Sequence, residues 1–205
     1  MIGNDVVDLK VAALESNWMR LGFLDKVFSE EEQEVILNSD NKSQMVWLFW
    51  SMKEAAYKIY MQQFGVRIFN PKKLRCERHS ENKGLVHFNG YKYATKSEIT
   101  NDFINTWAYL ETSVNALILC FKITDSSYIT QSLAAKQKLL KSFSEIKKVS
   151  ETDLDIKSSK NNIPRLFYKG YEQRDSFSIA HHGFYVACAI SFLSPILKFN
   201  THPLC

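Results

Sequence analysis

The chain has 205 residues, of which 45% are hydrophobic and 13% aromatic. This length and apolar content suffice for one sizeable globular domain or two small packed halves, which excludes a disordered chain. Lysine and arginine number 26 against 22 aspartates and glutamates, a net charge of +4. That mild excess suits a phosphorylated or acidic partner, but it lacks the density of a dedicated nucleic-acid-binding surface.

Cysteine usage and hydropathy indicate the compartment. The sequence has no Cys-x-x-Cys pair and no histidine spacing that would build a zinc site; its cysteines are Cys76, Cys120, Cys188 and Cys205. Reduced thiols in a cytosolic protein are the simplest account. The first residues lack the pattern of a signal peptide, and no apolar run is long enough to span a bilayer. We therefore expect a cytoplasmic protein without a membrane segment.

The N-terminal stretch, residues 2–9, combines β-branched residues with a glycine and the carboxylates of Asp5 and Asp8. This predicts a short strand that runs into a turn or helix. A helix should begin after Ser29, the N-cap, with Glu32 completing a capping box. The glutamates of its first turn favour the positive end of the helix dipole, so we expect a structural role for them.

A longer helix is predicted after the polar break at 38–42, running to about Gln63 and ended by Gly65. One face is apolar at helical spacing: Met45, Leu48, Met52, Ala55, Ala56 and Ile59. The opposite face surrounds two charged residues, Glu54 and Lys58, with large side chains: Trp47, Trp50, Tyr57 and Met61. We expect the aromatic residues to pack between two parts of the molecule.

Glu54 needs a partner, because a carboxylate in an aromatic surface is costly unless a cation, a metal or hydrogen bonds satisfy it. Lys58, one turn further on, could form an ion pair worth about 0.2–0.5 kcal/mol. Alternatively, Glu54 ligates a divalent metal and Lys58 holds a phosphate. The second interpretation requires further ligands elsewhere in the chain.

Strand patterns follow the long helix, at Leu74–Arg78, Leu85–Phe88, Tyr91–Ala94, Ile104–Glu111 and Val114–Ile123, and they predict an antiparallel meander. A second, lysine-studded helix is expected at Ile129–Lys147, and residues 151–162 are polar. The stretch Phe177–Gly183 then runs into a strand at Phe184–Ile190. Alternation along a strand sends His181 and His182 to opposite faces, so we expect at most one of them to face a given site.

The order of elements repeats, with a helix and then strands in residues 1–125 and again in 126–205. We therefore predict an α+β fold of two similar αβββ-like halves, with separate domains as the alternative.

Three short stretches carry a family resemblance: Gly3-Asn4-Asp5, Trp50-Ser51-Met52-Lys53-Glu54-Ala55-Ala56-Tyr57-Lys58 and Ser178-Ile179-Ala180-His181. Together they resemble the 4′-phosphopantetheinyl transferase superfamily, with its Gly-x-Asp strand end, Lys-Glu helix and histidine strand. A matching Phe-Ser-Glu-Glu-Glu helix start lies between the first two stretches. The resemblance is strongest over residues 1–75 and 160–190.

The resemblance implies magnesium-dependent transfer of the phosphopantetheine arm of coenzyme A to a serine of an acyl- or peptidyl-carrier protein, a holo-acyl-carrier-protein synthase activity. By position, Asp5 and Glu54 would be the metal ligands, with manganese as an alternative ion. Lys58, with Lys53, would add positive charge near the phosphoryl group, and Glu54 would take the serine proton. His181 would contact a coenzyme A phosphate.

Some positions depart from the family pattern. Larger, surfactin-synthetase-type members have a second acid where this chain has Val7, although Asp8 follows directly. Ala180 and His182 replace the hydroxyl residues that usually flank the histidine, so a contact to coenzyme A is lost unless His182 supplies it.

The order of motifs suggests a monomeric pseudodimer whose halves are swapped relative to the larger type. Residues 129–190 resemble that type's N-terminal half, with Asn162-Ile163-Pro164 like its Gly-Lys-Pro segment. The site would then lie between the halves, with Asp5 and Glu54 from the first and His181 from the second. The alternative is a non-catalytic module of the same fold that binds coenzyme A or a carrier protein. A nucleic-acid-binding domain is a third interpretation, for which the sequence has no motif.

Overall fold

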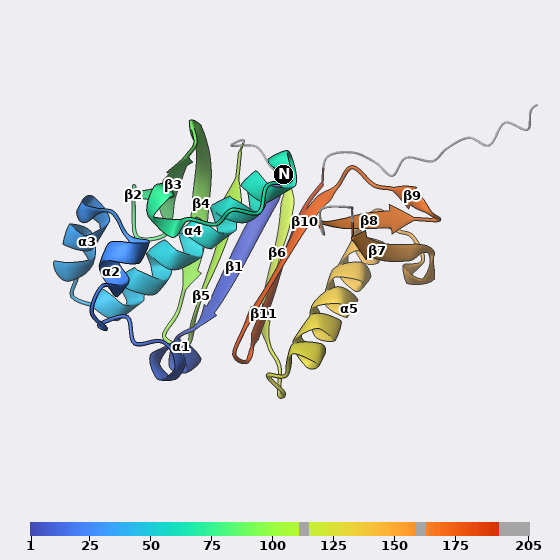
Figure 1. The fold of residues 1–205 in the computed structure, drawn as a ribbon. Coiled ribbons are helices and arrows are strands. Elements are labelled where there is room, and N and C mark those ends of the chain that lie inside the picture. The colour runs from blue at the N-terminus through green and yellow to red at the C-terminus, as the bar shows by residue number, and fades with distance from the viewer. Residues whose placement is uncertain (111–114, 159–162, 193–205) are drawn as a thin grey trace, which may run out of the picture.

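The computed structural model describes residues 1–110, 115–158 and 163–192 and shows an α+β fold with three antiparallel sheets (Figure 1). Glu111, Val114, Asn162 and Cys205, named in the predictions above, lie outside these residues. No helix among the described residues is both long and apolar enough to cross a membrane.

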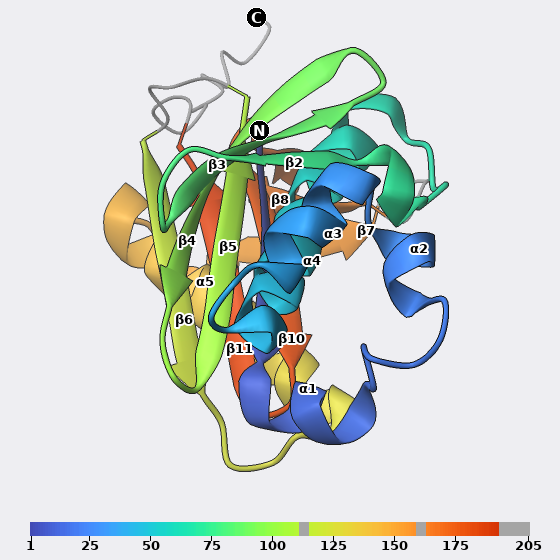
Figure 2. The ribbon, with the colours of Figure 1, turned by 90° about the vertical axis from the view of Figure 1, so that its left-hand side faces the viewer.

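The first half is built on a five-stranded sheet with the strand order β1-β5-β4-β3-β2. Its elements are β1 (Ile2–Asp8), α1 (Leu9–Glu15), α2 (Phe23–Val27), α3 (Glu30–Leu37), α4 (Lys42–Phe64), the 3-10 turn η1 (Pro71–Lys73), β2 (Arg75–Arg78), β3 (Lys83–Phe88), β4 (Tyr91–Ile99) and β5 (Phe103–Tyr109). Figure 2 shows α4 lying against one face of this sheet.

The second half contains a sheet of order β10-β11-β6 and a smaller one of order β7-β8-β9. Its elements are β6 (Ala116–Lys122), α5 (Tyr128–Lys147), the 3-10 turn η2 (Glu151–Asp153), β7 (Leu154–Ser158), β8 (Pro164–Tyr168), β9 (Tyr171–Glu172), β10 (Ser176–His182) and β11 (Tyr185–Ser191). The two halves meet in the middle of the molecule, where β1 lies beside β10 (Figure 1).

The predicted helix ends are confirmed where short sequence motifs determine them. Ser29 and Glu32 form the predicted capping box of α3, and Gly65 ends α4 in the left-handed conformation with φ 68°. The meander is correct for β2 to β5, but β6 is not part of it, because β6 pairs with β11 in the second sheet. The chain therefore crosses to the second sheet before β6, earlier than the predicted division at residue 125.

Both halves share one connection pattern. Each begins with a strand that pairs antiparallel with the last strand of that half: β1 with β5, and β6 with β11. A long helix, α4 or α5, lies between the two in sequence. Each half thus has a strand before its long helix and more strands after it than the predicted αβββ unit, and the pseudodimer stays a prediction.

Each half has its own hydrophobic core, and a small third cluster joins them: Val6, Ala180, Tyr185 and Ala187. The prediction that the aromatic residues of α4 pack between the halves is wrong. Trp50 and Tyr57 contact the ring of Phe69, with centroids 5.8 and 4.8 Å apart, and Trp47 belongs to the first core. Phe69, in the chain that follows the helix, packs on Trp50 and Tyr57, and Trp47 and Trp50 border the cavity described below.

The backbone of α4 approaches β1 closely at Gly3. A Cβ atom at this position would clash with the backbone carbonyl oxygen of Ala55. Glycine therefore allows the helix to lie directly on the strand. Glu54 directly precedes Ala55, and Asp5 lies two residues after Gly3 on the same face of β1. The same approach therefore brings their carboxyl groups near each other.

We expect Gly3→Ala to lower the free energy of unfolding by about 3 kcal/mol, because the clash is with helix backbone that cannot move aside. Gly170→Ala is the control: its φ of +83° is strained for alanine, but nothing lies within 4 Å of its added Cβ. Urea unfolding of both variants measures the difference. An equal loss for the two would show that the contact between α4 and β1 is not the constraint.

Candidate active site between the halves

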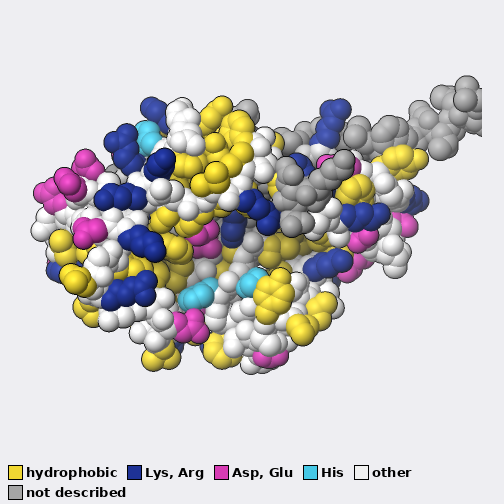
Figure 3. Space-filling view, in the orientation of Figure 1, with side chains coloured by type: hydrophobic (Ala, Val, Ile, Leu, Met, Phe, Trp, Pro, Cys, Tyr) yellow, Lys and Arg dark blue, Asp and Glu magenta, His cyan; other side chains and the backbone are white. Residues whose placement is uncertain are grey.

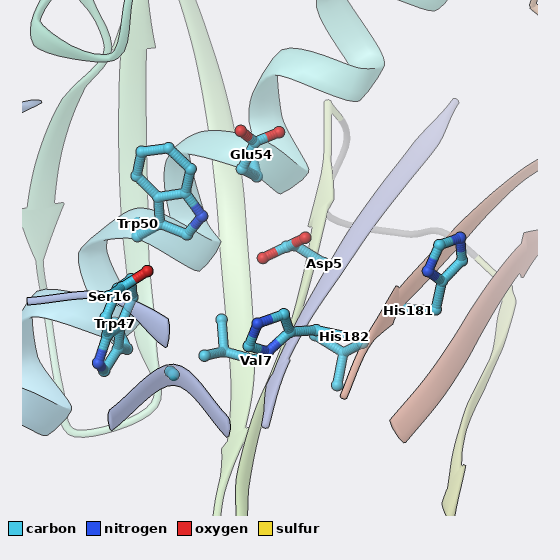
Figure 4. A pocket seen from close by; sticks show the side chains of 10 residues that line it. Asp5, Val7, Ser16, Trp47, Trp50, Glu54, His181 and His182 are labelled. Carbon is cyan, nitrogen blue, oxygen red and sulfur yellow. The ribbon is translucent and has the colours of Figure 1, made fainter. Parts of the chain in front are cut away.

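A cavity of ≈330 Å³ lies between the halves, where Figure 3 shows histidine and acidic side chains in a hollow. It is lined by ten residues: Asp5, Val6, Val7, Ala12, Ser16, Trp47, Trp50, Glu54, His181 and His182. The structure thus brings Asp5, Glu54 and His181 to one place from β1, α4 and β10, the arrangement that the sequence predicted. Figure 4 shows Asp5 on β1 and Glu54 on α4 on the same side of the pocket, with Trp50 beside them.

Asp5 is half-buried, and its carboxyl group is only partly satisfied. Burial raises its pKa, against the opposing effect of the Lys58 ammonium, which lies 3.7 Å from Oδ1. The other oxygen, Oδ2, is buried and has no hydrogen-bond partner in the protein. A buried carboxylate oxygen without a partner is costly, so this atom calls for a cation or a donor from a ligand.

Glu54 has a pKa raised to about 7, first by burial and then by the negative charge of Asp5, against the opposing effect of Lys58. Its nearest predicted partner does not pair with it: the ion pair of Lys58 is with Asp5. Two half-buried carboxyl groups therefore line one cavity, and the charge of Asp5 disfavours the charged form of Glu54.

These residues fit a hard divalent cation. Among the residues described, no group of three or more His, Cys, Asp or Glu side chains could hold a metal unaided. Magnesium does not need such a cage, because it takes one or two carboxylates and completes its shell with phosphate oxygens and water. Asp5, with its unpartnered oxygen, and Glu54 supply that donor set.

His181 is half-buried, and its ring meets the edge of Tyr128 with centroids 5.5 Å apart. Burial lowers its pKa, and the positive charge of Lys58 adds to this effect. The imidazole is therefore neutral near pH 7, with one N–H to donate and one nitrogen to accept.

His182 also lines the cavity, so the prediction that at most one of the two histidines faces a given site is wrong. β10 is an edge strand, and a cavity at a sheet edge borders both faces of the strand. The backbone N–H of Asp8 donates to Nδ1 of His182 at 3.0 Å, which leaves Nε2 as the protonated nitrogen of the neutral ring. Nε2 lies 3.8 Å from Glu15.

Asp8 has a structural role here. Its Oδ1 accepts the backbone N–H groups of Lys10 and Val11 at the start of α1, and Oδ2 accepts that of Phe184. Asp8 is not among the residues that line the cavity, and both of its carboxylate oxygens accept hydrogen bonds. It therefore links α1 to the turn between β10 and β11.

Lys53, predicted to bind the cofactor, lies elsewhere, and that prediction is corrected. Its side chain is fully buried, and Nζ donates to Glu32 Oε2 at 2.7 Å and to the carbonyl oxygens of Pro71 and Leu74 at 2.9 and 2.6 Å. All three protons of the ammonium are thus used inside the first half. Lys53 and Glu54 are adjacent on a helix, so they point about 100° apart.

Lys58 lies at the junction of the halves and is not among the residues that line the cavity. Its Nζ donates to the carbonyl oxygens of Asn4 at 2.7 Å and Ile179 at 3.3 Å. Only one proton is left for Asp5 or a phosphate. Sequence reasoning missed Gln62, which makes the same kind of link one turn further on, although its i+4 spacing from Lys58 was a usable signal.

We expect Lys53→Met to lower the free energy of unfolding by about 3–5 kcal/mol, because it leaves the Glu32 carboxylate buried without its cation. The double variant Glu32→Gln/Lys53→Met should recover part of this loss, since no unpaired charge remains. Urea unfolding measures both. A loss below about 1 kcal/mol, or weaker coenzyme A binding at unchanged stability, would contradict the structural role.

The metal-free protein should lose stability between about pH 5 and 8. Folded Glu54 has a pKa of about 7, above its value in the unfolded chain, so the folded state binds more protons in this window and stability falls as pH rises. The expected loss is about 3 kcal/mol.

Urea unfolding with EDTA at pH 5 and pH 8 tests this. Glu54→Gln should flatten most of the slope, leaving the smaller part from Asp5, whereas Glu30→Gln at an exposed position of α3 should keep it. An unchanged slope in Glu54→Gln would show that this carboxyl group is not the one that titrates.

Comparison with known proteins identifies the family. A family model described as ACPS, 4′-phosphopantetheinyl transferase superfamily, matches residues 1–109. No curated protein matches the chain. A solved structure of Thermotoga maritima holo-[acyl-carrier-protein] synthase is similar at 12% identity over 83% of each chain, with a TM-score of 0.43, which supports no further conclusion. Since the family model covers more than half of the sequence, the chain belongs to the 4′-phosphopantetheinyl transferase superfamily, as its motifs predicted.

Proposed function

We propose that this protein transfers 4′-phosphopantetheine from coenzyme A to a serine of an acyl- or peptidyl-carrier protein, as a holo-acyl-carrier-protein synthase does. Its superfamily uses coenzyme A and acts on carrier proteins. One observation carries the proposal for this chain: the half-buried carboxyl groups of Asp5 and Glu54 share a cavity with His181 from the other half.

Asp5 and Glu54 would hold magnesium, or manganese as an alternative ion. When bound, the cation would neutralise charge on the pyrophosphate of coenzyme A. The residues around it set its environment: burial raises the affinity of both carboxyl groups for positive charge, and the Lys58 ammonium beside Asp5 limits how far the pKa of Asp5 rises.

Glu54 is also the proposed base. In the transfer, the serine oxygen bonds to the phosphorus that carries the pantetheine arm, the bond from this phosphorus to the bridging oxygen breaks, and 3′,5′-ADP leaves. The serine proton would pass to a Glu54 oxygen, directly or through one water. A carboxylate whose pKa lies near 7 suits this role, because it is both available and basic at neutral pH.

The histidines would hold the phosphates of coenzyme A. Neutral His181 can donate one hydrogen bond to a phosphate oxygen, and His182, which lines the same cavity, would donate through Nε2–H. Lys58 would add positive charge beside Asp5. Lys53 has no part in this proposal.

The setting we propose is a cytoplasmic monomer, because both halves of the site come from one chain and Cys76, Cys120 and Cys188 are free thiols. A second candidate function is non-catalytic binding of coenzyme A or a carrier protein. Two observations favour it: Val7 lines the cavity where larger members have an acid, and both oxygens of Asp8 are taken by backbone N–H groups.

We expect coenzyme A and Mg²⁺ to produce a phosphopantetheine adduct on at least one of several apo-carrier proteins, measured by carrier mass. Asp5→Asn and Glu54→Gln should each lower kcat/KM by about 100-fold or more, because each removes charge stabilisation made in the transition state. Glu30→Gln, at an exposed acid outside the cavity, should keep wild-type activity.

The outcomes separate the two functions. Coenzyme A binding without an adduct on any carrier would favour the binding module. Full activity of Glu54→Gln would refute the role of this carboxyl group as metal ligand and base.

A further inference from the structure

Two side chains of α4 cross-link the halves next to the cavity. Lys58 Nζ donates to the carbonyl oxygens of Asn4 in β1 and Ile179 in β10, at 2.7 and 3.3 Å. One turn further on, Gln62 Nε2 donates to the carbonyl oxygens of Ile2 in β1 and Phe177 in β10, at 2.9 and 3.2 Å. We call Lys58 and Gln62 the bridge pair.

The spacing of the bridge pair matches the strands it joins. Four residues of α-helix rise about 6 Å, and two residues of a strand rise about 6.6 Å. The acceptors are two residues apart on each strand, at 2 and 4 on β1 and at 177 and 179 on β10. The helix therefore runs along both strands, with one donor for each pair of facing carbonyl groups.

These links matter because β1 and β10 are edge strands of different sheets. No backbone ladder joins them in the part of the chain that the structure describes. Side chains make the junction instead: besides the bridge pair, Ser178 Oγ accepts the N–H of Asn4 and His182 Nδ1 accepts the N–H of Asp8, each at 3.0 Å. Together with the apolar cluster of Val6, Ala180, Tyr185 and Ala187, these few bonds hold the two strands in place.

The cavity residues sit directly beside these bonds. Asp5 follows Asn4 on β1, His181 lies two residues beyond Ile179 on β10, and Glu54 is one turn before Lys58 on α4. Whatever holds β1 against β10 therefore sets where Asp5 lies relative to His181. Lys58 also contacts Asp5, but Gln62 is uncharged and is not among the residues that line the cavity.

We propose that Gln62 is a positioning residue: it holds β1 against β10 and thereby places the carboxyl group of Asp5 relative to His181. The link between the strands stands on the hydrogen bonds alone, whereas its effect on turnover rests on the proposed transferase function.

The test compares three variants. Gln62→Leu removes the hydrogen bonds to Ile2 and Phe177. Gln62→Lys introduces an ammonium group that can donate to both carbonyl oxygens, as that of Lys58 does, and Gln63→Leu is the control. Gln63 is the next glutamine of α4 and accepts from Tyr93 Oη at 2.9 Å within the first half. Gln62 is partly exposed, so its variants should fold.

Two measurements are made on the full chain. Hydrogen exchange at the amides of Asn4 and Asp8 reports the junction directly, since both donate across it. Steady-state kinetics with coenzyme A and an apo-carrier protein measure the effect on turnover at the proposed active site. In Gln62→Leu we expect at least tenfold faster exchange at these amides and an at least tenfold lower kcat, with KM for coenzyme A changed less than threefold.

Gln62→Lys should return both quantities to within about threefold of wild type, and Gln63→Leu should change neither. Wild-type exchange in Gln62→Leu would overturn the link, and faster exchange with unchanged kcat would overturn the positioning role. A wild-type protein that transfers nothing would refute the proposed function instead, and the exchange result would still decide whether Gln62 joins the strands.

Discussion

The site depends on one close contact, the approach of the α4 backbone to β1 at Gly3. Because glycine has no Cβ, the carbonyl oxygen of Ala55 can occupy the space above the strand. Asp5 lies two residues after Gly3 on β1, and Glu54 directly precedes Ala55 on α4. The contact thus brings two half-buried carboxyl groups to one cavity, where the charge of Asp5 opposes the ionisation of Glu54. Holding two acidic groups this close costs stability and has no evident structural benefit. It does suit a site that binds a cation and accepts a proton.

The helix α4 divides its polar residues among three directions. Lys53 points into the first half, where it neutralises Glu32 and satisfies two carbonyl groups. Glu54 turns toward the cavity, and Lys58 and Gln62 reach the two edge strands. Since successive residues are turned by about 100°, one helix can stabilise a core, form a site wall and join two sheets. The Lys-Glu-x-x-x-Lys string therefore contains three different roles within six residues.

Sequence reasoning succeeded where the signal was local or carried by motifs. The capping box at Ser29, the end of α4 at Gly65 and the strand segments of the first sheet follow from short-range preferences. It failed where the outcome depends on distant contacts. The pairing of β6 with β11 is set by the second half, and the burial of Lys53 depends on Glu32 and the chain after α4. His182 was misjudged because alternation describes a sheet face and not its edge.

The junction between the halves differs in character from the two cores. Its apolar cluster is small, and Ala180 and Ala187 allow the backbones to approach. Polar groups lie around it, among them the fully buried side-chain amide groups of Asn4 and Asn105, which have no hydrogen-bond partner in the protein. Such groups weaken an interface, since each loses its contacts with water without full replacement. A junction of this kind contributes little stability of its own, so the geometry of a site built across it must come from directed bonds, which α4 supplies through Lys58 and Gln62.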